Sequence, residues 1–240
     1  MADYSGALQS FETCSTLWTV PTFPLLAAAL CAWWSRGTRD NERGASREAR
    51  AGRVAILCAA ISVLAALTHT LLLARLPSEE RCLLNHIALS ARIGTFDASI
   101  SLSMDALTSL LSIVVSGAGL CVLVHSVATL RGLPGHNRRL AAISLGVGGM
   151  LIVCLASDFV FMFVGWGASG VATLLLVSEN ERFGARAARI GFVTARLADA
   201  LLVAGICVLF WTFGGGFSEA GSYVPELKPR LVGVGRASLE

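Results

Sequence analysis

The sequence predicts an all-α integral membrane protein of about six transmembrane helices, with a short β-hairpin outside the membrane. Two features of composition carry this prediction: 55% of the residues are hydrophobic and only 15% are charged, and the mean hydropathy is +0.68. Ordinary soluble domains have about 25% charged residues and a smaller apolar share. The third feature is placement, because the apolar residues form long stretches and the arginines gather between them.

Six apolar stretches have the length, about 17 to 25 residues, that a helix needs to cross roughly 30 Å of hydrocarbon. The first carries Pro21 and Pro24 near its start, where a helix has unpaired backbone donors in any case. Trp18, Trp33 and Trp34 mark its ends, as expected for aromatic side chains in the membrane interface. The predicted helices cover residues 17–34, 54–75, 104–128, 140–156, 158–177 and 190–212.

The connections on one side of the predicted bundle are rich in arginine. Residues 35–53 hold six arginines, and residues 131–139 and 178–189 hold three each. The tails and connections on the opposite side together hold six lysines and arginines. Cytoplasmic loops of membrane proteins carry the excess of Lys and Arg. We therefore expect a multi-pass protein of the cell inner (cytoplasmic) membrane, with these three connections in the cytoplasm and both termini outside.

The outer connection over residues 76–103 differs from the other loops. Its segments HIALSARIG and TFDASISLS approach an alternation of apolar and polar residues, which predicts an extracytoplasmic β-hairpin. The other outer connection, at residues 156–158, is short enough to require a tight turn between antiparallel helices. The chain is thus divided into an outer tail (1–16), a membrane domain (17–212) and a second outer tail (213–240).

The cysteines and the charge indicate what this chain does not bind. None of the seven cysteines has the CxxC or Cys/His spacing of a zinc or iron–sulfur site. No GxGxxG opens a strand–helix unit, so we expect no nicotinamide, flavin, other cofactor or metal, and no redox site. A net charge of +3 with dispersed arginines does not favour nucleic acid. Cys14 and Cys82 fall on the same outer side and could form a disulfide.

Arg196 and Asp199, in GFVTARLADALL, are charged residues inside a predicted transmembrane helix. A charge at the bilayer centre costs about 2.5–3.5 kcal/mol on insertion scales, so it requires compensation. Three residues apart on one helix, the two side chains share a face and can neutralise each other. They are candidates either for a buried ion pair that supports packing or for a proton path facing water.

Two histidines and two carboxylates are weaker candidates. His69 and His125 lie within or near the ends of predicted helices, where an imidazole either packs with a hydrogen bond or carries protons. Asp105 and Asp158 lie at predicted helix starts, where a carboxylate meets the positive end of the helix dipole. Helix capping is a sufficient explanation for both carboxylates.

The segment GWGASG interrupts one of the most apolar parts of the chain. Gly165 and Ser169 form a small-xxx-small face that lets another helix approach closely. We expect this whole segment, including Trp166, Gly167 and Gly170, to form a helix-packing surface.

Three long stretches together carry a resemblance to a known family: MDALTSLLSIVVSGAGLCVLVHS, LIVCLASDFVFMFVGWGASGVATLLL and ARAARIGFVTARLAD. Their order and spacing resemble the first half of the antiporter-like L subunit of respiratory complex I, the proton-translocating subunit of NADH–quinone oxidoreductase. The resemblance covers about residues 18–215 and extends to cation/proton antiporter and membrane-hydrogenase subunits. It implies a proton channel built on discontinuous helices, a glutamate in the fifth helix and lysines in later helices.

The residues of this chain depart from that pattern. The family's GWE motif corresponds to Gly165, Trp166 and Gly167, so a glycine stands at the position of the channel glutamate. Ile190 stands where a lysine usually precedes the Arg…Asp pair, which corresponds to Arg196 and Asp199. The resemblance therefore implies a split, truncated or degenerate subunit that works with other membrane subunits of a larger complex. The alternatives are a non-transporting membrane scaffold or assembly partner, and one half of a cation/proton antiporter-type subunit.

Overall fold

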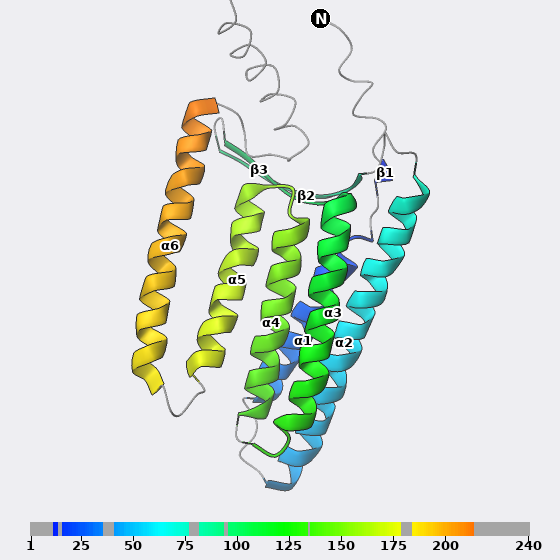
Figure 1. Cartoon of the computed structure of the whole chain (residues 1–240), viewed down its shortest axis with the longest axis vertical. Coiled ribbons are helices and arrows are strands. Elements are labelled where there is room, and N and C mark those ends of the chain that lie inside the picture. The colour runs from blue at the N-terminus through cyan, green and yellow to red at the C-terminus, as the bar shows by residue number, and fades with distance from the viewer. Residues whose placement is uncertain are drawn as a thin grey trace, which may run out of the picture.

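The computed structural model describes residues 12–13, 16–35, 41–76, 82–93, 96–133, 135–178 and 184–213. These residues form six helices and a small sheet at one end of them (Figure 1). The helices are α1 (Thr19–Ser35), α2 (Asn41–Arg75), α3 (Ala106–Thr129), α4 (His136–Leu155), α5 (Phe159–Ser178) and α6 (Gly184–Phe213). The strands are β1 (Glu12–Thr13), β2 (Leu83–Ile93) and β3 (Phe96–Met104).

The predicted all-α membrane fold is confirmed. Five helices contain a segment long and apolar enough to cross a membrane, and α1 is a shorter apolar helix of 17 residues. Helices α1 to α4 form a four-helix bundle in which α1 contacts both α2 and α4. Helix α5 packs on α4, and α6 packs mainly on α5 at the edge of the bundle (Figure 1). The chain is therefore a multi-pass membrane protein.

The starts of α2 and α6 differ most from the prediction, and both differences have one cause. Helix α2 begins at Asn41 and not at residue 54, so most of the arginine-rich connection at 35–53 is helical. Helix α6 begins at Gly184 and not at residue 190. Both extensions are rich in Ala and Arg, which favour helices, and arginine does not favour the membrane interior. Hydropathy marks the part of a helix that crosses the membrane and misses a polar extension.

The β-hairpin predicted over residues 76–103 is present as antiparallel strands β2 and β3. A register shift interrupts their pairing between His86 and Ser90. Strand β1, which pairs with β2 in parallel, was not predicted. Helix α3 begins two residues later than predicted because Met104 belongs to β3 and is fully buried.

The hairpin closes one end of the bundle against the turn between α4 and α5. Leu102 of β3 pairs with Ala156, and the Ser157 backbone N–H donates to the Ser101 carbonyl at 3.2 Å. The two serine hydroxyls also lie 2.6 Å apart in a buried hydrogen bond. The predicted tight turn at 156–158 is confirmed, and the sheet holds it in place.

Helix α1 is joined to α2 by a hydrogen bond that Pro24 makes necessary. Proline has no backbone N–H, so the carbonyl four residues earlier loses its helical donor. That carbonyl belongs to Val20, and the fully buried Ser62 hydroxyl of α2 donates to it at 2.6 Å. The proline therefore creates an acceptor that fixes α1 to its neighbour.

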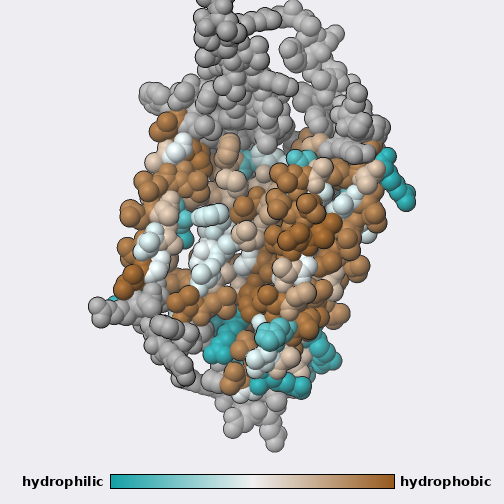
Figure 2. Space-filling model, viewed as in Figure 1, coloured by the Kyte–Doolittle hydropathy of each residue, from teal (hydrophilic) through white to brown (hydrophobic). Residues whose placement is uncertain are grey.

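Helix α3 turns a small, polar face inward. Its buried residues recur at spacings of three and four, which places them on one side of the helix. Three inner serine hydroxyls donate to carbonyls of α3 itself, at 2.9, 2.7 and 2.6 Å. Apolar residues occupy the outer face, in agreement with the brown surface of Figure 2, where hydrophilic side chains gather mainly at the end away from the sheet. The inner residues are Ser109, Ser112, Ser116, Gly119, Leu123 and Ser126.

Candidate functional site

Helices α4 and α5 touch at backbone distance through two glycines. A Cβ added to Gly165 would lie 2.8 Å from the Gly149 carbonyl oxygen and 2.8 Å from a methyl carbon of Ile152. A Cβ on Gly149 would lie equally close to the Gly165 carbonyl and to the Ser169 hydroxyl. Only glycine fits at these two positions without moving a helix. Gly165 and Ser169 thus lie on the face of α5 that meets α4.

A polar cluster joins α5 to α6 near the middle of both helices. One terminal nitrogen of Arg196 lies 2.7 Å from Asp199 Oδ2, which makes an ion pair along α6. The Trp166 indole N–H of α5 donates to Asp199 Oδ1 at 2.8 Å. The Arg196 guanidinium also lies over the Phe192 ring, 5.2 Å from its centroid. Both carboxylate oxygens therefore have a partner in low dielectric.

The two charged side chains of this cluster are buried to different extents. The Asp199 side chain keeps 10% of its surface exposed and the Arg196 side chain 37%. Arg196 Nε is buried and has no hydrogen-bond partner among the described residues. A Cβ on Gly170 would lie 2.7 Å from an Arg196 terminal nitrogen, so this glycine makes room for the guanidinium.

The cluster borders a mostly apolar cavity of about 490 Å³ between α5 and α6. Thr173 and Val177 of α5 line one wall, and Gly191 and Phe192 of α6 line the other. Most of the opposite face of α6 is exposed in the described part of the chain. The ion pair is thus a polar site near the middle of α6, where the surroundings are mostly apolar.

Gly167 departs from the expected packing role. A Cβ added there would meet no atom within 4 Å in the described part of the chain, because Gly167 lies on a different side of α5 from Gly165 and Ser169. Trp166 is 46% exposed and contacts α6 through its indole nitrogen. The GWGASG segment therefore has two roles, α4 contact through Gly165 and Ser169 and α6 contact through Trp166 and Gly170.

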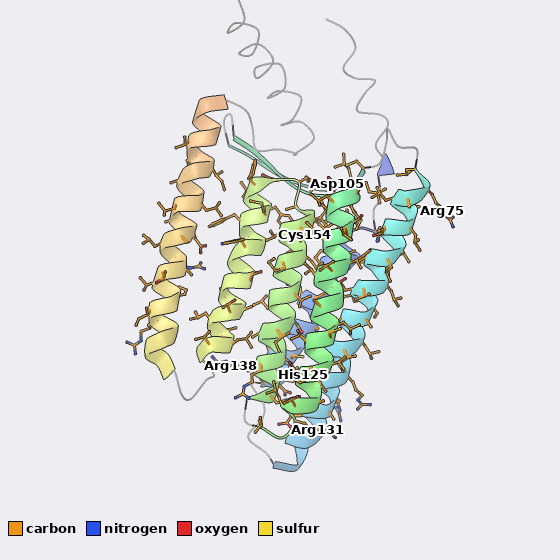
Figure 3. The ribbon with its side chains drawn as sticks, viewed as in Figure 1. Arg75, Asp105, His125, Arg131, Arg138 and Cys154 are labelled. Carbon is orange, nitrogen blue, oxygen red and sulfur yellow. The ribbon has the colours of Figure 1, made fainter. Side chains whose placement is uncertain are left out.

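The structure separates the candidate histidines from this cluster. His69 of α2 is 6% exposed, and its Nδ1–H donates to the Ala65 carbonyl at 2.6 Å. Its Nε2 then accepts from the Thr16 hydroxyl at 3.0 Å, which joins α2 to the residues before α1. His125 lies on the exposed face of α3, 3.4 Å from the Thr129 hydroxyl (Figure 3). Neither histidine is brought to Arg196 or to Asp199.

The two helix-start carboxylates have the geometry of caps. Asp105 accepts from the Thr108 backbone N–H at 2.7 Å, and the Thr108 hydroxyl accepts from the Asp105 N–H, which completes a capping box. Asp158 accepts from the Val160 N–H at 3.0 Å at the start of α5. Capping, the explanation expected from the sequence, describes both sites.

Burial raises the pKa of Asp158 to about 6 from its ordinary value of 3.8, against the opposing effect of the Val160 N–H bond. A carboxyl whose pKa is raised on folding binds its proton more tightly in the folded state. The contribution to stability is therefore full below about pH 4 and is lost as the pH rises through about 6. Protonated Asp158 is the form that suits its buried position between the hairpin and α5.

Two structural contacts were not anticipated from the sequence. The Trp166–Asp199 bond joins residues far apart in the chain, for which no periodic signal exists. The Ser62–Val20 bond had a partial signal, since Pro24 reveals an unpaired carbonyl but not its donor. Cys14 lies outside the described residues, and Cys82 is a free thiol. In the described part of the chain, no three His, Cys, Asp or Glu side chains cluster as metal ligands would.

The segment that holds the polar cluster is similar to known membrane proteins. Residues 156–230 match the transmembrane model of the NADH:quinone oxidoreductase/Mrp antiporter family. The chain is similar to the antiporter-like L subunit of NADH–quinone oxidoreductase. The subunit L of Mycobacterium tuberculosis is 30% identical over 123 residues, which cover 50% of this chain and 19% of that protein. The resemblance read from the sequence is confirmed.

A longer alignment and a solved structure extend this similarity. A probable inorganic carbon transporter subunit of Halothiobacillus neapolitanus is 28% identical over 199 residues, which cover 82% of this chain and 32% of that protein. A chain in the archaeal membrane-bound sulfane sulfur reductase, a respiratory membrane complex, covers 82% of this chain with a TM-score of 0.59 and 19% identity. That likeness shows the fold, and this chain spans 28% of the solved one. The chain thus spans about a fifth to a third of the relatives and the structure it matches.

Proposed function

We propose that this chain is a membrane subunit of a respiratory or antiporter-type complex, related in role to the L subunit, and that it works with other membrane subunits. The observation that carries the proposal is the Arg196–Asp199 pair, which lies at mid-span of α6 inside the family-matched segment. Relatives named as complex subunits and the exposed outer face of α6 support it. We place the chain in the cell inner membrane and expect no redox chemistry in it.

Within this role, we assign the pair to holding α6 against α5. The Trp166 bond to Asp199 and the space left by Gly170 both direct the charges toward α5. Gly167 offers no ionisable group beside them, whereas a proton path needs successive groups that exchange protons. A proton path through Arg196 and Asp199 is the competing assignment, suggested by their position in the family pattern.

The test is a double-mutant cycle on the full chain in its native membrane. An unpaired charge in low dielectric costs several kcal/mol, so Asp199→Ala alone should reduce the amount of assembled complex. Adding Arg196→Ala should partly restore assembly if the pair only joins helices. If the double variant assembles normally but the complex no longer translocates protons, the proton-path assignment is correct instead. Equal tolerance of both single variants, in assembly and in transport, would reject both assignments.

Co-purification tests whether the chain belongs to a larger membrane complex. Mild detergent extraction followed by native electrophoresis and mass spectrometry should recover it in fixed stoichiometry with membrane subunits of a quinone oxidoreductase or related complex. A chain that migrates alone in amounts equal to its total would contradict the subunit role.

A non-transporting scaffold is the second candidate, and a specific observation favours it. The glycine at position 167 leaves the family's channel position without a proton-carrying group, and the surrounding space is open in the described residues. A complex that assembles only with this chain, yet translocates protons equally well with the Arg196→Ala/Asp199→Ala variant, would support the scaffold. A half of a cation/proton antiporter-type subunit would instead show cation-dependent proton exchange.

The orientation is part of the same proposal. We propose that the connections at 35–53, 131–139 and 178–189 face the cytoplasm, with both tails outside, because twelve arginines lie in those connections and six lysines and arginines in the outer ones. A Ser46→Cys variant in a background without native cysteines should resist a membrane-impermeant thiol reagent added from outside. Strong labelling of intact cells at that position would contradict the proposed orientation and place residues 35–53 outside.

A further inference from the structure

A second cavity lies at the end of the bundle away from the sheet, between the start of α2 and the end of α3. It measures about 570 Å³ and does not touch the α5–α6 cluster. Its walls include Arg53 and Ile56 of α2, Val124 and Val127 of α3, and Arg131 and His136 beyond α3. Figure 3 labels Arg131 at this end, and Figure 2 shows hydrophilic side chains gathered there.

The outer rim of this groove is cationic and has no counter-ion in the described part of the chain. Arg53 is exposed, and its Nε donates to the Ala49 carbonyl of its own helix at 3.2 Å. Arg131 is exposed just beyond α3. Among the described residues, neither guanidinium has a carboxylate within ion-pair distance. Both retain donors for an anion.

A buried histidine stands at the same rim. His136 is 2% exposed, and its Nδ1–H donates to the Leu130 carbonyl at 3.0 Å. This bond fixes the orientation of the ring. His136 thus forms a fixed part of the groove wall, and the donors for an anion are the guanidinium groups of Arg53 and Arg131.

The inner wall of the groove is apolar. A Cβ on Gly52 would lie 2.9 Å from a methyl carbon of Val127, so α2 and α3 meet closely there. Ile56 lies one turn deeper in the membrane-crossing segment than Arg53, and Val124 lies about two turns deeper than Arg131. The groove therefore has cations at the ends of the membrane-crossing segments and apolar side chains deeper in the membrane. This arrangement is complementary to a lipid with an anionic headgroup and an acyl chain.

We propose that this groove binds an anionic phospholipid, with its phosphate at Arg53 and Arg131 and an acyl chain along Ile56 and Val124. Guanidinium groups bind phosphate oxygens in a bidentate manner, and basic pockets between transmembrane helices accept anionic headgroups. Inorganic phosphate would use the rim and leave the apolar wall uncovered. The site is independent of the proposed subunit role, since it uses no residue of the α5–α6 cluster.

The test measures lipid binding to the full chain in neutral detergent by native mass spectrometry. The wild type should retain phosphatidylglycerol in preference to phosphatidylcholine. Each arginine near a membrane surface contributes about fivefold, so Arg53→Gln/Arg131→Gln should weaken phosphatidylglycerol binding about thirtyfold. Arg75→Gln is the matched control, because Arg75 is an exposed arginine at the opposite end of α2 (Figure 3). It should leave the affinity unchanged.

Two further measurements distinguish lipid binding from the binding of a free anion and from an effect of misfolding. Val124→Ser changes only the apolar wall, so it should weaken phosphatidylglycerol and leave the binding of inorganic phosphate unchanged. Circular dichroism in lipid-free detergent should match for all variants, and Arg131→Gln alone should cost about fivefold if the double variant does not fold. Unchanged affinity in the arginine variants, equal retention of both lipids by the wild type, or full displacement of the lipid by equimolar inorganic phosphate would each overturn the proposal.

Discussion

Gly165→Ala and Gly167→Ala form a matched pair that tests the α4–α5 contact. Both change one glycine to alanine on the same helix, two residues apart. Alanine favours a helix over glycine by about 1 kcal/mol, and this gain is common to both variants. The difference in unfolding free energy between them therefore measures packing alone.

The structure gives the expected size of that difference. At position 165 the new methyl group would lie 2.8 Å from the Gly149 carbonyl oxygen, a backbone atom that moves only if α4 moves. At position 167 the methyl group would meet nothing within 4 Å in the described part of the chain. Overpacking a tight interface costs about 1–3 kcal/mol. We expect Gly167→Ala to be neutral or stabilising and Gly165→Ala to be less stable than it by about 1–3 kcal/mol.

The assay is reversible unfolding of the full chain in mixed micelles, with circular dichroism followed as the fraction of denaturing detergent increases. Gly149→Ala should resemble Gly165→Ala, and the two together should cost less than their sum, because one separation of the helices accommodates both methyl groups. Equal stability of Gly165→Ala and Gly167→Ala would refute the close contact of α4 with α5.

Three other substitutions have defined outcomes in the same unfolding assay. Trp166→Phe removes a donor to a buried carboxylate and should cost about 1.5–3 kcal/mol, whereas Trp33→Phe, at a site 72% exposed, should cost much less. Asp158→Asn should keep the helix cap and abolish the loss of stability that the wild type shows as the pH rises from about 4 to about 6; an unchanged pH profile would contradict the raised pKa. Ser62→Ala should cost about 1–3 kcal/mol because it leaves a buried carbonyl unpaired, and Pro24→Ala should recover part of that loss by restoring the helical donor; no recovery would show that the proline does not create the need for the serine.

The helices could be predicted from the sequence because each needs a long apolar stretch, and a bilayer sets that length. Their polar extensions could not be predicted in this way, since hydropathy does not register a helix that continues into water, as α2 does from Asn41. The hairpin was predictable from its alternating residues. The two-residue strand β1 was not, because a strand that short has no period.

The candidate site was predictable only in its local part. Arg196 and Asp199 are three residues apart on a helix, so geometry alone brings them together. Their contacts with Trp166 and Gly170 depend on how α6 rotates against α5, which no short-range pattern specifies. Gly167 is expected on the same packing surface as Gly165 if the GWGASG segment is taken as a unit, whereas the helical rotation between positions 165 and 167 puts them on different sides.

The inner serines of α3 have a consequence for which substitutions this bundle tolerates. Their hydroxyls donate to carbonyls of the same helix, so they act toward α2 and α4 as small side chains and not as polar ones. The neighbours of α3 therefore recognise its shape, as where a Cβ on Gly119 would lie 2.6 Å from a methyl carbon of Val147. Exchange of these serines for alanine or glycine preserves the fit, whereas a valine or leucine with no polar atom at all would separate the helices. Side-chain volume, more than polarity, is therefore the property that this interface restricts.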